Sequence, residues 1–64
     1  MPGYGWSYLT VMHVPDTLIW RTSDSGAFTS EEEMFRELGV TGWELVAIRE
    51  FKGSIVYYFK RPRA

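Results

Sequence analysis

Histidine is the residue type that titrates near neutral pH, and this sequence has one, His13, which is the first candidate for acid–base chemistry. Nucleophilic catalysis would add a hydroxyl beside the imidazole and a carboxylate to orient it. Ser7, Thr10 and Asp16 are close in sequence, but no local motif marks any of them for these roles. We therefore predict that the protein is not an enzyme and that His13 lies at a strand end, on the surface or in an interface. A small enzyme that uses His13 is the alternative.

Acidic residues occur in two arrangements, and neither predicts a metal site. Glu31, Glu32 and Glu33 are consecutive, so on a helix their side chains point about 100° apart and cannot converge on one ion. They suit the first turn of a helix instead. Glu44 and Glu50 lie on one predicted strand, too far apart to act as a carboxylate pair without a partner strand. With no cysteine and one histidine, the sequence predicts no metal and no cofactor.

Positive and aromatic side chains are interleaved in the C-terminal part of the chain, where Lys52, Lys60, Arg61 and Arg63 follow Glu50 without a further acid. Aromatic rings on a sheet can stack on bases while Lys and Arg bind phosphates. We predict a small anionic ligand such as a nucleotide, bound at a subunit interface. The residues predicted to bind it are Trp20, Arg49, Tyr57, Tyr58, Lys60 and Arg61. A single-stranded nucleic-acid-binding accessory protein is the alternative, against which stands the formal net charge of −1.

The length of 64 residues allows a single domain, residues 1–64, and limits the surface that folding can bury to about 60%. A hydrophobic content of 45% predicts a folded chain, but a domain this small usually needs an additional source of stability. The absence of cysteine excludes disulfides and thiolate metal sites, which leaves oligomerisation. No run of residues is long and apolar enough to span a membrane, and the N-terminus does not resemble a signal peptide. We expect a cytoplasmic protein.

The pattern of residue types predicts an α+β fold with the order ββαββ, in which one helix packs on one face of a small antiparallel four-stranded sheet. The predicted strands are residues 6–14, 17–22, 43–51 and 54–60. Ser23 to Gly26 predicts a loop, and Lys52-Gly53 a tight hairpin turn. Thr29-Ser30 predicts the helix start. Gly39 predicts its end in the left-handed conformation, with the next residue covering Phe35.

Both faces of the predicted sheet are apolar, whereas one helix can cover only one of them. A second copy of the chain, packed face to face or joined edge to edge, would cover the rest. We therefore predict a homo-oligomer, most simply a dimer. Its interface residues are predicted to be Tyr8, Thr10, Met12, Trp20, Val56 and Tyr58. For Trp20 the sequence leaves three roles open: capping the core, anchoring the interface, or forming one wall of a ligand cleft.

Three segments carry a family resemblance: GWELV at residues 42–46, the short acidic helix before it that ends in Leu38-Gly39, and YYFKRP at residues 57–62. With these motifs the chain resembles a small bacterial and phage family of unknown function, catalogued under the number four-one-seven-seven. The likeness covers most of the chain and is weakest around Trp20. It implies the same fold, and it implies no activity and no catalytic residue.

Overall fold

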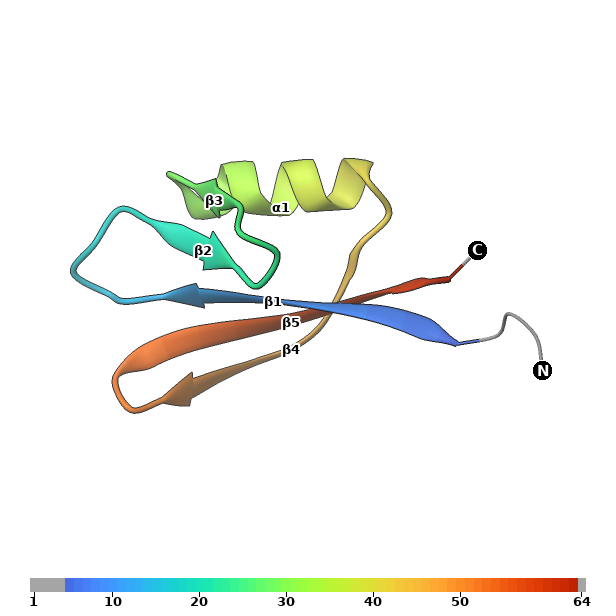
Figure 1. Cartoon of the computed structure of the whole chain (residues 1–64). Coiled ribbons are helices and arrows are strands. Elements are labelled where there is room, and N and C mark those ends of the chain that lie inside the picture. The colour runs from blue at the N-terminus through green and yellow to red at the C-terminus, as the bar shows by residue number, and fades with distance from the viewer. Residues whose placement is uncertain (1–4, 64) are drawn as a thin grey trace.

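The computed structural model describes residues 5–63, which form five strands and one helix. The elements in chain order are β1 (Trp6–His13), β2 (Trp20–Thr22), β3 (Ala27–Phe28), α1 (Glu31–Val40), β4 (Glu44–Phe51) and β5 (Ser54–Pro62). All strands belong to one antiparallel sheet with the order β3-β2-β1-β5-β4, and α1 lies on one side of it (Figure 1). The predicted α+β class is confirmed. Among residues 5–63, no helix has the length and apolarity that crossing a membrane requires.

The prediction of four strands was wrong, because the chain after β2 folds back and adds β3 at the sheet edge. Ser25 has a φ of 79°, and the backbone N–H of Thr22 donates to the Gly26 carbonyl, which closes a turn at the predicted loop. The two residues of β3 then pair with β2. A strand of two residues has no alternation that a sequence pattern could reveal.

β2 is also shorter than predicted. Thr17 belongs to the turn before it, where its backbone N–H and its side-chain hydroxyl both donate to the Val14 carbonyl. The connection between β1 and β2 therefore extends to Ile19 and carries exposed apolar side chains such as Leu18.

The core forms between the two central strands and the helix. Leu9 and Val11 on β1 are paired with Phe59 and Tyr57 on β5, so all four side chains point to the same face. Met34 and Leu38 of α1 pack on them, and these six residues form one buried cluster. We call this side of the sheet the helix face and the other side the open face. Among residues 5–63, no element covers the open face (Figure 1).

The start of α1 is set by local side-chain chemistry, as predicted. The N-cap is Ser30, whose hydroxyl accepts a hydrogen bond from the Glu33 backbone N–H at 3.0 Å. The Glu33 carboxylate in turn accepts from the backbone N–H of Thr29. Three glutamates occupy the first turn, where negative charge interacts favourably with the helix dipole.

The predicted helix end at Gly39 was wrong, because α1 continues to Val40 and Gly42 takes the left-handed conformation with a φ of 91°. The N–H of Gly42 donates to the Gly39 carbonyl and that of Trp43 to the Leu38 carbonyl, the two bonds of a Schellman motif. This later end places Trp43 next to the core cluster, where it is partly buried. Packing of that ring explains why the second glycine, not the first, ends the helix.

β4 is an edge strand with an irregular register. Leu45 is paired with Phe59 and Ala47 with Tyr58, so Val46 is an extra residue in a β-bulge. Strict alternation would place Leu45 and Ala47 on one face and Val46 and Ile48 on the other, but the bulge changes this arrangement. Leu45 and Ile48 instead share the helix face, and Ala47 lies on the open face. All eight residues of β4 are exposed.

Candidate functional site

The six predicted ligand-binding residues do not form one site, because they lie on opposite faces of the sheet. Arg49, Tyr58 and Lys60 point to the open face, since they are in register with Val56, Thr10 and Tyr8. Trp20, Tyr57 and Arg61 point to the helix face. The prediction combined Tyr57 with Tyr58 and Lys60 with Arg61, and neighbouring residues on one strand necessarily point to opposite sides.

The predicted interface residues, unlike the predicted ligand-binding residues, lie mostly on one face of the sheet. Five of the six share the open face, on the central strands β1 and β5: Tyr8, Thr10, Met12, Val56 and Tyr58. The exception is Trp20, which is paired with His13 and lies on the helix face. The open face is thus the surface where the chain gathers exposed aromatic side chains outside its core.

Three rows of side chains cross this face perpendicular to the strands. The first contains Tyr8, Lys60 and Glu44, and the second contains Thr10, Tyr58 and Ala47. The third contains Arg21, Met12, Val56 and Arg49. Directly opposite side chains are about 5 Å apart at Cβ, so each row can contact a single small ligand.

Aromatic rings and cations alternate on the open face. Tyr8 is 71% exposed, and Trp6, which also points to this side, carries Lys60 Nζ at 4.0 Å from its ring centroid. The Arg49 guanidinium lies 5.1 Å from the ring of Phe51. These cation–π contacts restrict the cations without neutralising them. Charged groups remain available beside exposed aromatic surface.

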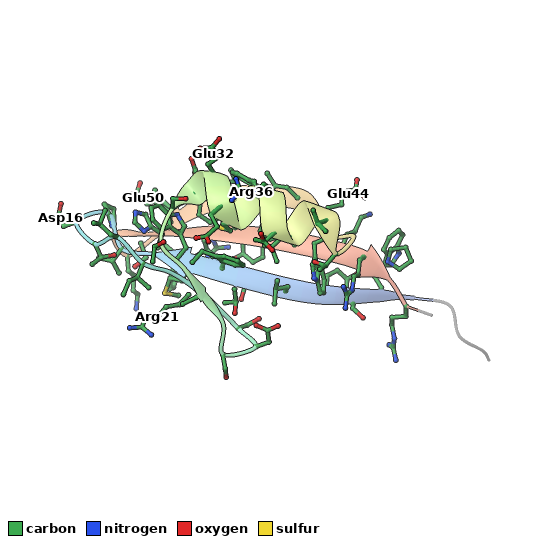
Figure 2. All side chains as sticks on the ribbon, turned by 90° about the horizontal axis from the view of Figure 1, so that it is seen from above. Asp16, Arg21, Glu32, Arg36, Glu44 and Glu50 are labelled. Atoms are coloured by element: carbon green, nitrogen blue, oxygen red, sulfur yellow. The ribbon has the colours of Figure 1, made fainter. Side chains whose placement is uncertain are left out.

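The two faces of the sheet differ in charge. On the open face, the strands present Arg21, Arg49 and Lys60 against one carboxylate, Glu44. On the other side, α1 carries four glutamates and one arginine. Figure 2 shows Glu32 and Arg36 on the helix, and places Arg21 at the opposite edge of the sheet from Glu44 and Glu50. The formal net charge is only −1, yet a basic surface lies on one side of the sheet and an acidic one on the other.

A shallow pocket of about 180 Å³ adjoins the β2 side of the open face. Its lining residues are Met12, Val14, Thr17, Ile19 and Arg21. It is smaller than the roughly 300–1,000 Å³ typical of drug-sized ligand sites. A ligand on this face would therefore rest on an exposed platform and use the pocket for at most one of its groups.

Two residues of the open face, Arg21 and Trp6, were missed as candidates although their positions could indicate them. Trp6 is two residues before Tyr8 on the same strand and thus shares its face, and Arg21 follows the inward-pointing Trp20. The predicted ligand residue Arg61 has a structural role instead. Its guanidinium donates to the carbonyl of Thr41, the C-cap of α1, at 2.7 Å and lies 4.3 Å from the ring centroid of Trp43.

His13 is the last residue of β1, at a strand end as predicted, and it is buried within the chain, with 9% of its surface exposed. Its ring stacks on Trp20 with a centroid distance of 3.9 Å and an interplanar angle of 2°. Nδ1 lies 3.0 Å from the Ile19 carbonyl and donates to it. Of the roles considered for Trp20, packing at the edge of the core is the one its contacts show.

The residues considered as catalytic partners of His13 do not surround it. Thr10 points to the open face, Asp16 lies in the exposed connection after β1, and Ser7 is six residues, about 20 Å, away along the strand. Within residues 5–63, no three histidine, cysteine, aspartate or glutamate side chains are grouped so that they could hold a metal ion. The described residues contain neither a catalytic triad around His13 nor a metal-ligand cluster.

One buried polar contact links the core to the helix start. The hydroxyl of Tyr57, whose side chain is buried, donates to Glu31 Oε2 at 2.6 Å. Burial raises the pKa of Tyr57 above its ordinary value of 10.0, and the hydrogen bond to Glu31 and the charge of that carboxylate raise it further. The Trp20 indole N–H, close to this hydroxyl, lowers the pKa of Tyr57 in opposition. That N–H is buried and has no hydrogen bond of good geometry with a described residue.

Comparison with protein-family models, with curated proteins and with solved structures finds no match to this chain. The function is therefore inferred from the geometry of the open face.

Proposed function

We propose that the protein is a non-enzymatic, self-associating binding module whose open face binds a small anionic ligand with an aromatic ring, such as a nucleotide. One observation carries the proposal: the sheet brings exposed Tyr8 and partly buried Tyr58 into the same surface as Arg21, Arg49 and Lys60. Rings of this kind stack on bases, and cations beside them bind phosphates. The proposal includes membership of the family of unknown function that the sequence resembles. This membership implies no enzymatic activity.

The rows of the face suggest how such a ligand would lie. A base on Tyr8 would have the ammonium group of Lys60 directly beside it on the neighbouring strand. Arg49 lies on β4 opposite Val56, in the third row, two rows from Lys60. Its guanidinium could reach a phosphate chain that extends from that base. Thr10 supplies a hydroxyl between them. The helix face offers no comparable surface, because the Tyr57 ring and the Arg61 guanidinium already have partners there.

A second candidate, binding of single-stranded nucleic acid, is favoured by the open shape of the site. The pocket beside the face is too small to enclose a nucleotide. An exposed platform accepts a polymer that continues past its edges as readily as a single nucleotide. Three cations predict a modest salt slope, roughly −2 in log K against log salt for a single strand.

The test is fluorescence anisotropy with two probes, a labelled mononucleotide and a labelled single-stranded decanucleotide, over a salt series. Tyr8→Ala should weaken binding about 5- to 150-fold, because stacking on one ring contributes roughly 1–3 kcal/mol. Lys60→Ala should weaken binding and make the salt slope shallower. Val40→Ala, an exposed apolar residue at the end of α1, is the matched control and should bind like the wild type.

The two probes separate the candidates. Comparable affinity for both supports the small-ligand proposal, and binding of the decanucleotide alone supports the second candidate. If neither probe binds the wild type at low salt, or if Tyr8→Ala and Lys60→Ala bind as the wild type does, the open face is not the binding surface.

A further inference from the structure

The sheet has two edges, and they differ in a way that bears on the proposed self-association. β3 ends the sheet with two residues, too short to template another strand. β4 ends it with eight residues, all exposed, and no described element lies on its outer side, away from β5 (Figure 1). Its outer side therefore presents a row of unpaired backbone N–H and carbonyl groups.

Apolar side chains accompany this open edge. Leu45, Val46 and Ile48 are 38%, 54% and 52% exposed. On the helix face, Leu45 and Ile48 are paired with Phe59 and Tyr57, the two rings that the half-exposed Phe35 contacts from α1. The result is an apolar strip along β4, on the helix face, that α1 does not cover.

We propose that β4 pairs antiparallel with β4 of a second copy of this chain, about a two-fold axis between Val46 and Ala47. The proposal rests on the self-association proposed above and names its surface. It joins two sheets edge to edge and leaves both open faces exposed on the same side. The ligand platform of each copy then continues into that of the other.

The positions of the charges favour this register. With the axis between Val46 and Ala47, Glu44 lies opposite the second copy's Arg49, and both point to the open face. Leu45 lies opposite the second copy's Ile48, and both point to the helix face. These face matches depend on the bulge, because without the extra residue an axis between two residues would pair opposite faces. A register centred on Arg49 would place two guanidinium groups opposite each other, at a cost.

The alternative modes of self-association are disfavoured either by charge or by symmetry. Packing two open faces together would oppose Arg21, Arg49 and Lys60 to the same three cations. Packing an open face on the acidic helix of the next copy would match opposite charges, but this contact is head to tail and gives a ring of copies or an open filament in place of a two-fold dimer. Pairing along β4 is isologous and closed, and it satisfies the backbone groups of the edge.

The contact area sets the expected strength. Two paired strands of this length with their neighbouring side chains bury roughly 800–1,000 Å², below the range of most stable dimers. We therefore expect a dimer with a Kd in the micromolar range. It should be measured by native mass spectrometry and sedimentation over a concentration series that extends about tenfold above that range.

Charge reversal tests the register. Glu44→Arg alone places two cations opposite each other twice in the dimer, and Arg49→Glu alone places two carboxylates there, so each variant should dimerise at least tenfold more weakly than the wild type. Mixed together, the two variants should form a heterodimer of wild-type affinity, because both opposed pairs are then attractive. Their mass difference identifies the heterodimer. Glu32→Arg, on the exposed side of α1, should dimerise as the wild type does.

A second variant keeps the test independent of the charge pair. Val46→Lys places a charge at the bulge in the centre of the edge and should give a folded monomer by circular dichroism and sedimentation. If the wild type dimerises and neither Val46→Lys nor the charge reversals change its Kd, the interface lies elsewhere and self-association stands without this inference. If the wild type stays monomeric throughout the series, edge pairing is overturned, and ligand binding by the open face is judged by its own assay.

Discussion

The buried hydrogen bond between Tyr57 and Glu31 allows a prediction with a worked magnitude. Tyr57→Phe keeps the ring that belongs to the core cluster and removes only the hydroxyl. A hydrogen bond to a charged group contributes about 1.5–3 kcal/mol, and the exposure of Glu31 places this one near the lower end. We expect a loss of about 1–2 kcal/mol in the free energy of unfolding. For a domain of this size that corresponds to a fall of roughly 5–15 °C in Tm.

The same contact predicts a dependence on pH. Because the folded state raises the pKa of Tyr57, the neutral hydroxyl stabilises the fold fully below about pH 10, the ordinary value. This stability is lost as the pH rises through the raised pKa, where a buried phenolate would face the Glu31 carboxylate. Thermal melts from pH 7 to pH 11 should therefore show a steep alkaline loss of stability in the wild type. Tyr57→Phe should show a shallower one.

Tyr58→Phe is the matched control, because the neighbouring hydroxyl lies on the open face and makes no hydrogen bond with a described residue. It should melt within about 0.5 kcal/mol of the wild type, as surface substitutions usually do. The reasoning is refuted if Tyr57→Phe and Tyr58→Phe are equally stable at pH 7, or if Tyr57→Phe keeps the full alkaline loss.

The helix gives the remaining predictions, each measured by urea unfolding. Gly39→Ala should stabilise the fold by about 0.5–1 kcal/mol, because Gly39 lies inside α1 and an added Cβ meets nothing within 4 Å. Gly42→Ala should destabilise it by about 1–2 kcal/mol, because Gly42 has a φ of 91°; changes of the same sign at both glycines would contradict the assigned helix end. Ser30→Ala should cost about 1 kcal/mol by removing the N-cap hydrogen bond, and an unchanged midpoint would show that another group caps α1.

The sequence predicted correctly those parts of the fold that a few neighbouring residues determine. The hairpin turn at Lys52-Gly53 is one, since both residues have positive φ, and the cap at Ser30 is another. Alternation along β1 and β5 correctly placed Leu9 and Tyr8 on opposite faces. Each of these features depends on a few neighbouring residues, and the sequence shows them directly.

The errors arise where the tertiary structure decides between local options. Gly39 and Gly42 are both suitable helix ends, and the burial of Trp43 selects the second. The bulge at Val46 arises from the pairing of β4 with β5, and no composition marks it. The predicted ligand residues are divided between the two faces for a simpler reason, because neighbouring charged and aromatic residues on one strand point to opposite sides. Sorting the same residues by face yields the open-face group.

The dimensions of the helix connect the two proposals. α1 has ten residues, so it is about 15 Å long and roughly 10 Å wide, which is the width of two strands at about 4.8 Å spacing. It covers β1 and β5, and β4 and the entire open face lie beyond its reach. The uncovered surfaces differ in chemistry: the edge is apolar with paired opposite charges that suit a second copy, and the face is aromatic and cationic. We therefore propose the edge for self-association and the face, which carries three cations beside aromatic rings, for a ligand.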